Sequence, residues 1–120
     1  MASALVLAGT NAFAYGSKST QLSNGVLTIA ADDGCVVSGN CSLYYSATKY
    51  KKTGGSKVTI QLRMSTGDEL FMASSRSISK GQTASHSWGG KKKSRVPDCT
   101  IVGHMTASTG VYYTPPIGVC

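Results

Sequence analysis

Apolar and polar side chains alternate strictly along residues 57–64, with Val58, Ile60, Leu62 and Met64 on one face. A period of two is the pattern of a β-strand that is buried on one side only. Less regular strand-like runs occupy residues 42–51, 68–73, 99–107 and 111–114. No apolar period of helical length occurs, so we expect these strands to pair with one another.

Turn signals rich in glycine separate the strand-like runs. Asn24-Gly25 lies between two such runs, and Asn-Gly supplies the positive φ angles of a two-residue hairpin turn. Further signals lie at residues 53–56, 65–68, 79–81, 89–90 and 109–110. Many short strands with frequent turns predict an all-β fold, namely a small antiparallel β-sandwich or barrel.

Length and composition narrow the class further. A chain of 120 residues is long enough for one domain, and its 41% hydrophobic content supplies one core and argues against disorder. Only 14% of the residues are charged, which is too few for a coiled coil. A helical bundle, a membrane-spanning protein and a large α/β enzyme are therefore excluded.

The first residues have the features of a secretory leader. An uncharged apolar stretch at residues 2–9 precedes Ala12-Phe13-Ala14, an A-x-A cleavage pattern, although the usual basic start is missing. We predict a leader over residues 1–14, an extended polar arm over residues 15–23 and a single β-domain over residues 24–120. The alternative for the apolar stretch is an ordinary N-terminal strand; it is too short to span a membrane, which takes roughly 20 apolar residues.

Four cysteines support an extracellular location. An even number in a short chain with a leader predicts two disulfides. We favour the pairs Cys35–Cys41 and Cys99–Cys120, which join neighbours in sequence, and two other connectivities remain open. A zinc site is disfavoured because no C-x-x-C motif occurs and both histidines lie far from the cysteine pairs. We expect no metal and no cofactor.

Residues suited to catalysis are scattered. Asp32-Asp33 and Asp68-Glu69 flank turn glycines, and neighbouring residues on a strand point to opposite faces, so neither pair makes an acid/base couple. His86 and His104 could serve a small secreted ribonuclease as base and acid, but no motif holds them together. We therefore expect no catalytic residues and keep the ribonuclease as the second alternative.

The sharpest charge feature is the basic run Lys91, Lys92, Lys93 and Arg95. The 12 basic and 5 acidic residues give a net charge of +7. The run could bind an anionic cell-envelope surface, which would make the protein a free-standing cationic antimicrobial, or it could be a solvated loop. We do not expect nucleic acid to be the partner. Trp88, the single tryptophan, could lie in the core or at an interface.

Two segments resemble the small bridging component of bacterial umbrella toxin particles: DCTIVGHM at residues 98–105 and PPIGVC at residues 115–120. The polar arm YGSKSTQLSNG after the leader adds to the resemblance. The resemblance implies a secreted, non-catalytic adaptor in competition between bacteria, which links a lectin-bearing subunit to a repeat-containing toxin subunit. It also implies that the N-terminal arm inserts into a partner as an added strand. The partner-binding residues would then be Tyr15, Lys18, Thr20, Leu22 and Trp88.

Overall fold

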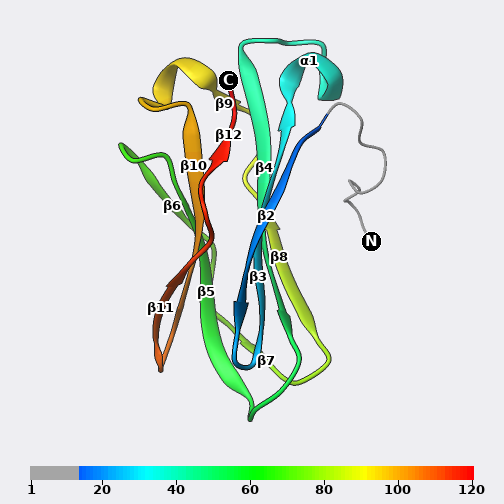
Figure 1. Ribbon diagram of the computed structural model, residues 1–120, viewed down its shortest axis with the longest axis vertical. Coiled ribbons are helices and arrows are strands. Elements are labelled where there is room, and N and C mark those ends of the chain that lie inside the picture. Colours follow the sequence, from blue (N-terminus) through cyan, green and yellow to red (C-terminus); the bar gives the residue numbers. More distant parts are fainter. Residues whose placement is uncertain (1–13) are drawn as a thin grey trace.

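The computed structural model describes residues 14–120, which form two antiparallel β-sheets packed face to face (Figure 1). The predicted all-β class is confirmed, and the architecture is a sandwich and not a closed barrel. No helix within residues 14–120 is both long and apolar enough to cross a membrane.

The first sheet has the strand order β2-β3-β4-β8, and β9 pairs with the start of β4. Its strands are β2 (Ala14–Leu22), β3 (Gly25–Asp33), β4 (Leu43–Lys52), β8 (Thr83–Ser87) and β9 (Lys91–Lys92). The hairpin predicted at Asn24-Gly25 is confirmed, because the turn joins β2 to β3 and leaves Leu22 paired with Gly25.

The second sheet has the order β11-β10-β5-β6, with β12 beside β10 and β7 beside β5. Its strands are β5 (Val58–Ser65), β6 (Leu70–Met72), β7 (Arg76–Ile78), β10 (Thr100–Ala107), β11 (Gly110–Tyr113) and β12 (Ile117–Gly118). Three of the four outer strands of the sandwich are thus split in two: β6 from β7, β8 from β9, and β11 from β12. Within residues 14–120, only β2 forms a continuous edge.

The alternating side chains place the core between the sheets. Leu27 and Ile29 on β3 are fully buried, and Ile60 and Leu62 on β5 are at most 3% exposed. Burying a side chain of this size contributes about 1.5–3 kcal/mol, so the facing inner surfaces are the main source of stability.

Both disulfides lie at one end of the sandwich, which we call the upper end (top of Figure 1). Cys35, in the short helix α1 (Gly34–Val37), is bonded to Cys41, and Cys99, just before β10, is bonded to Cys120. The favoured connectivity is confirmed. Two disulfides indicate that the chain folds in an oxidising environment. The 3-10 helix η2 (Lys93–Arg95) completes this end, and the turns β2–β3, β4–β5, β7–β8 and β10–β11 form the opposite, lower end.

The segment from Tyr15 to Leu22, predicted as an arm outside the core, instead belongs to β2. Residues 16–22 pair with β3, and Tyr15 and Leu22 pack against the core at the two ends of the strand. Gly16, with φ of 103°, follows a register shift that sets Tyr15 out of the ladder. A polar segment suits this position because an edge strand pairs on one side only. The predicted leader lies outside the described residues, apart from Ala14.

Candidate protein-binding surface

The outer face of the second sheet aligns side chains from four strands. Met72 on β6 pairs with Arg63 on β5. His104 on β10 pairs with both Arg63 and Tyr113 on β11. Paired residues of antiparallel strands direct their side chains to the same face. The next residues along β5 and β10, Met64 and Met105, are buried between the sheets, so this row points outward.

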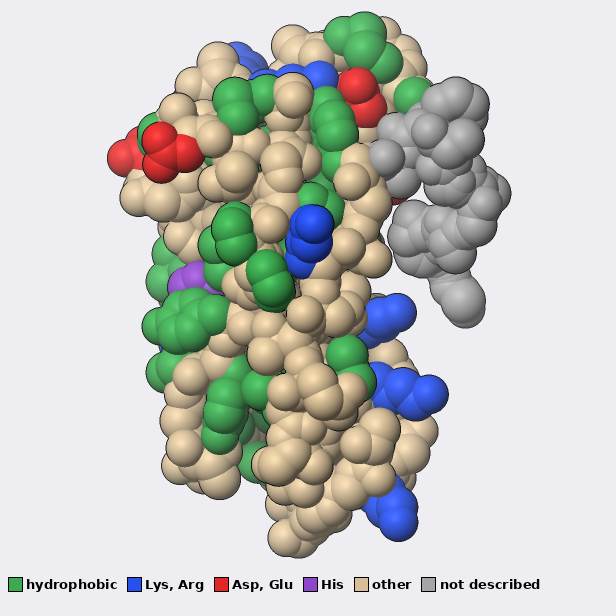
Figure 2. Space-filling model, in the orientation of Figure 1, with side chains coloured by type: hydrophobic (Ala, Val, Ile, Leu, Met, Phe, Trp, Pro, Cys, Tyr) green, Lys and Arg blue, Asp and Glu red, His purple; other side chains and the backbone are tan. Residues whose placement is uncertain are grey.

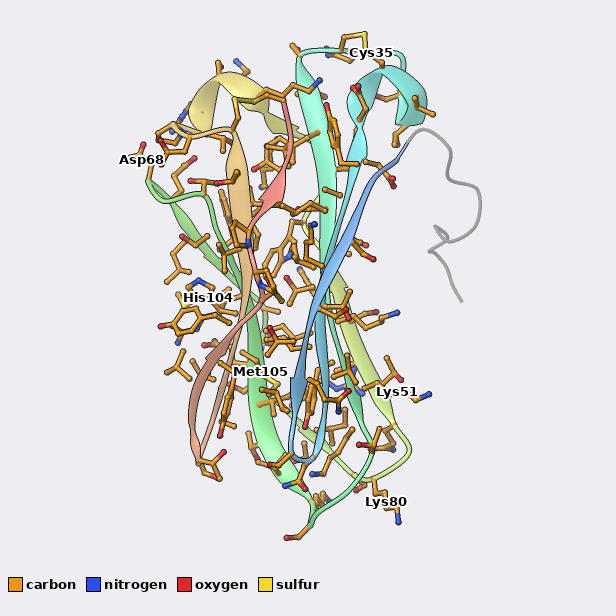
Figure 3. The ribbon with its side chains drawn as sticks, in the orientation of Figure 1. Cys35, Lys51, Asp68, Lys80, His104 and Met105 are labelled. Atoms are coloured by element: carbon orange, nitrogen blue, oxygen red, sulfur yellow. A yellow bond between two sulfur atoms is a disulfide. The ribbon has the colours of Figure 1, made fainter. Side chains whose placement is uncertain are left out.

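Large hydrophobic side chains are exposed along this row and beside it. The exposed fraction is 46% for Leu70, 56% for Met72, 49% for Val111 and 53% for Tyr113. Figure 2 shows hydrophobic side chains gathered around a histidine at the left edge of the molecule, where Figure 3 places His104. We call these four residues together with Arg63 and His104 the apolar face.

Of the two polar members of the apolar face, only Arg63 is charged at neutral pH. His104 packs edge-on against the Tyr113 ring, with 4.5 Å between the ring centroids. Burial, and then the positive charge of Arg63, lower the pKa of His104 below its usual 6.5, so this side chain is neutral at neutral pH. Arg63 donates from Nε to the Gln61 Oε1 atom at 2.9 Å and is half-buried. The surface is therefore apolar with one fixed cation.

The residues predicted to contact a partner on the N-terminal segment lie along the edge of the first sheet. Lys18 is exposed, and the Thr20 hydroxyl donates to the Tyr113 carbonyl at 2.8 Å, which ties β2 to β11. Tyr15 and Leu22 are half-buried. Within residues 14–120, β2 pairs with β3 on one side and with no strand on the other.

The structure places Trp88 in the core and not on a partner-binding surface. Its side chain is 8% exposed, and its indole Nε1 donates to the Thr48 Oγ1 atom at 3.0 Å. The Thr48 hydroxyl in turn donates to the Arg63 carbonyl at 3.0 Å. Because Thr48 lies on β4 and Arg63 on β5, this chain of hydrogen bonds joins the two sheets. The core alternative considered for Trp88 is the correct one.

The basic run is engaged in contacts within the molecule. Lys93 forms an ion pair with Asp33 at 3.1 Å, and Arg95 forms one with Glu69 at 3.2 Å. The ammonium of Lys91 lies 4.3 Å from the centroid of the Phe71 ring. Three of the four cations therefore make contacts at the upper end, while Lys92 and Arg95 stay exposed to solvent.

Charge is distributed very unevenly along the sandwich. All five acidic residues lie at the upper end, close to four of the twelve basic residues. The other eight basic residues, 12 − 4, lie below it among the strands and lower turns. Figure 3 shows this for Asp68 at the upper end and for Lys51 and Lys80 toward the lower end. The net charge is therefore −1 at the upper end and +8 elsewhere.

The residues considered for catalysis are not brought together. His86 lies on β8 of the first sheet, where its ring packs against Trp88, whereas His104 lies on the outer face of the second sheet. Asp33 caps α1 by accepting from the Cys35 backbone N–H at 2.9 Å. No group of three or more metal-ligating side chains that could hold an ion occurs in the described part of the chain.

Among the features of the surface, sequence reasoning missed the apolar face, since it depends on how four strands line up. Comparison with protein-family profiles, curated proteins and solved structures finds no match for this chain.

Proposed function

We propose that this chain is a secreted, non-catalytic adaptor that binds other protein subunits through its apolar face. The observation that carries the proposal is the set of four large hydrophobic side chains, each about half exposed, on one outer face of the sandwich. Contiguous exposed apolar surface on a soluble domain is typical of protein-binding sites. Tyr113 and Arg63 belong to the residue types that are enriched at the centres of such sites.

A second contact would make the protein a bridge. The open edge of β2 offers a row of main-chain donors and acceptors to which a strand of a partner can add, with Lys18 and Thr20 beside it. This replaces the inserted arm expected from the sequence by a strand that receives a partner. The partners we propose are subunits of a secreted bacterial toxin complex, as the resemblance at residues 98–105 and 115–120 implies.

Purification of the tagged protein from the culture medium of the cells that make it tests the proposal. We expect partner subunits to elute with it in a fixed ratio, as measured by mass spectrometry. The double variant Met72→Lys/Tyr113→Lys should lose at least one partner. The matched control is Val36→Lys/Val37→Lys, which changes two equally exposed hydrophobic residues on α1 and should keep every partner. Retention of all partners by the first variant, or elution of the parent protein alone, would contradict the proposal.

A further inference from the structure

A cavity of about 230 Å³ opens between the two sheets at the lower end. The buried side chains of Ile60 and Met105 form part of its apolar wall, together with the ring of Tyr112. Polar side chains, among them Asn24 and Lys57, lie around the rest of it. Figure 3 shows Met105 pointing into the space between the sheets. For comparison, an apolar cavity of about 150 Å³ binds benzene, so this volume suits a small organic molecule.

Lys52 also lines the cavity and is only 2% exposed. Its direction follows from the alternation along β4, where Tyr50 points inward, Lys51 outward and Lys52 inward again. Among residues 14–120, no side-chain hydrogen bond or ion pair is made by the Lys52 ammonium. The stem of Lys52 is buried along the cavity wall, and every acidic residue of the chain lies at the other end of the sandwich. The cavity therefore has a positive charge that the protein itself does not neutralise.

The wall of the cavity is fixed before any ligand enters. The Asn24 carbonyl accepts hydrogen bonds from the Thr53 N–H at 2.9 Å and from the Tyr50 hydroxyl at 3.1 Å. Gly25 permits this arrangement, because a Cβ atom there would lie 2.6 Å from the Tyr50 ring. The Tyr112 hydroxyl donates to the Thr109 Oγ1 atom at 2.6 Å. Both tyrosine hydroxyls already donate, so among the lining side chains the lysines supply the charged donors for an anion.

We propose that this cavity binds a small carboxylate with a compact apolar body, whose acidic group pairs with the Lys52 ammonium and whose body lies against Ile60 and Met105. Lys57, exposed near the mouth, adds a second positive charge. The ligand is either a free organic acid or the terminal carboxylate of a polypeptide, since both present the same chemistry. This site is at the lower end and does not include the apolar face, so it stands or falls independently of the adaptor function.

A titration of the full chain followed by NMR tests the site, with benzoate and hexanoate as probes and inorganic phosphate for comparison. We expect saturable shifts of the Met105 methyl and Tyr112 ring signals with the two carboxylates. Lys52→Met should weaken binding at least tenfold. Lys51→Met is the matched control, because Lys51 is next to Lys52 in sequence but is exposed on the outer face. This variant should bind the carboxylates as tightly as the parent protein. If Lys52→Met fails to fold, Lys52→Gln removes the charge and keeps polar character.

Two further titrations distinguish a free organic acid from a polypeptide terminus as the ligand. A short peptide ending in Leu with a free carboxylate that binds more tightly than benzoate identifies a polypeptide terminus, and tighter benzoate binding identifies a free acid. The same peptide with an amidated terminus should not bind in either case. The site is overturned if no probe gives saturable shifts at tens of millimolar, or if Lys52→Met and Lys51→Met bind equally well. If phosphate bound as tightly as benzoate, the proposed contact of an apolar ligand body with Ile60 and Met105 would be contradicted.

Discussion

The upper end of the sandwich holds both disulfides and, within residues 14–120, both ion pairs, whereas the lower end is closed by hydrogen bonds around a cavity. At the upper end, each acidic side chain that forms an ion pair meets a cation of the basic run. At the lower end, lysines lie without any acidic neighbour. Charges that neutralise one another stabilise the fold, while charges left without a partner are available to a ligand.

Removing the disulfides of the upper end should give the largest loss of stability. Replacing Cys99 and Cys120 by Ala opens a loop with a sequence separation of 21, and we expect it to lower the free energy of unfolding by roughly 3 kcal/mol. Replacing Cys35 and Cys41 opens a loop with a separation of 6, for which roughly 2 kcal/mol is expected. Urea unfolding followed by Trp88 fluorescence measures both. If either variant also lost benzoate binding, the two ends could not be treated as independent.

Removing a tyrosine hydroxyl should change stability differently at the two ends, because the Tyr50 hydroxyl has a hydrogen-bond partner and the Tyr44 hydroxyl has none in the described structure. Tyr50→Phe removes the bond to the Asn24 carbonyl at the lower end and should cost about 1 kcal/mol of stability. Tyr44→Phe removes a buried hydroxyl that has no partner in the described structure, and should be neutral or stabilising by up to about 1 kcal/mol. Burial, and then the charge of Glu69, raise the pKa of Tyr44 to about 12. Urea unfolding measures both variants, and a larger loss of stability in Tyr44→Phe than in Tyr50→Phe would contradict this expectation.

A smaller loss of stability is expected at low pH, and it should come from a carboxylate at the upper end. The Cys35 backbone N–H and then Lys93 hold the pKa of Asp33 below its ordinary 3.8. Since the folded-state pKa is the lower one, this stabilisation is complete above about pH 4 and is lost as the pH falls through the folded-state value. Asp33→Asn should therefore flatten the loss of stability below about pH 4.

The neighbouring carboxylate provides a control of opposite sign. Burial raises the pKa of Asp32, so its ionisation opposes folding as the pH rises past the folded-state value. Asp32→Asn should consequently increase stability at neutral pH. Urea midpoints at a series of pH values measure both variants, and a change of the same sign in both would show that these local contacts do not govern the acid response.

Local patterns in the sequence were sufficient for several of the strands and for the covalent links. The alternation along residues 57–64 predicts β5, Asn24-Gly25 predicts the first hairpin, and sequence proximity predicts both disulfides. The edge strand β2 was not predicted as part of the sheet. Its apolar contacts are confined to its ends, at Tyr15 and Leu22, so it shows no apolar period.

The surfaces could not be predicted, because they depend on contacts between distant parts of the chain. Lys93 reaches Asp33 across a separation of 60 residues, which converts the most basic segment of the sequence into a structural one. Alternation along β4 sets Lys52 on the face opposite to Lys49 and Lys51, but the sequence does not tell that this face borders a cavity, because the lining residues come from distant segments. Tyr113, His104 and Arg63 meet only through the register of three strands.

The division of the outer strands has a consequence for self-association. A growing fibre needs two usable edges on each molecule, one at either side, so that each copy can accept a neighbour and be accepted by another. Within residues 14–120, β2 is the one uninterrupted edge, and the other three positions consist of short strands broken by bends. Two copies that meet through β2 would use up their edges on each other. Such pairing would end at a closed twofold dimer and could not propagate.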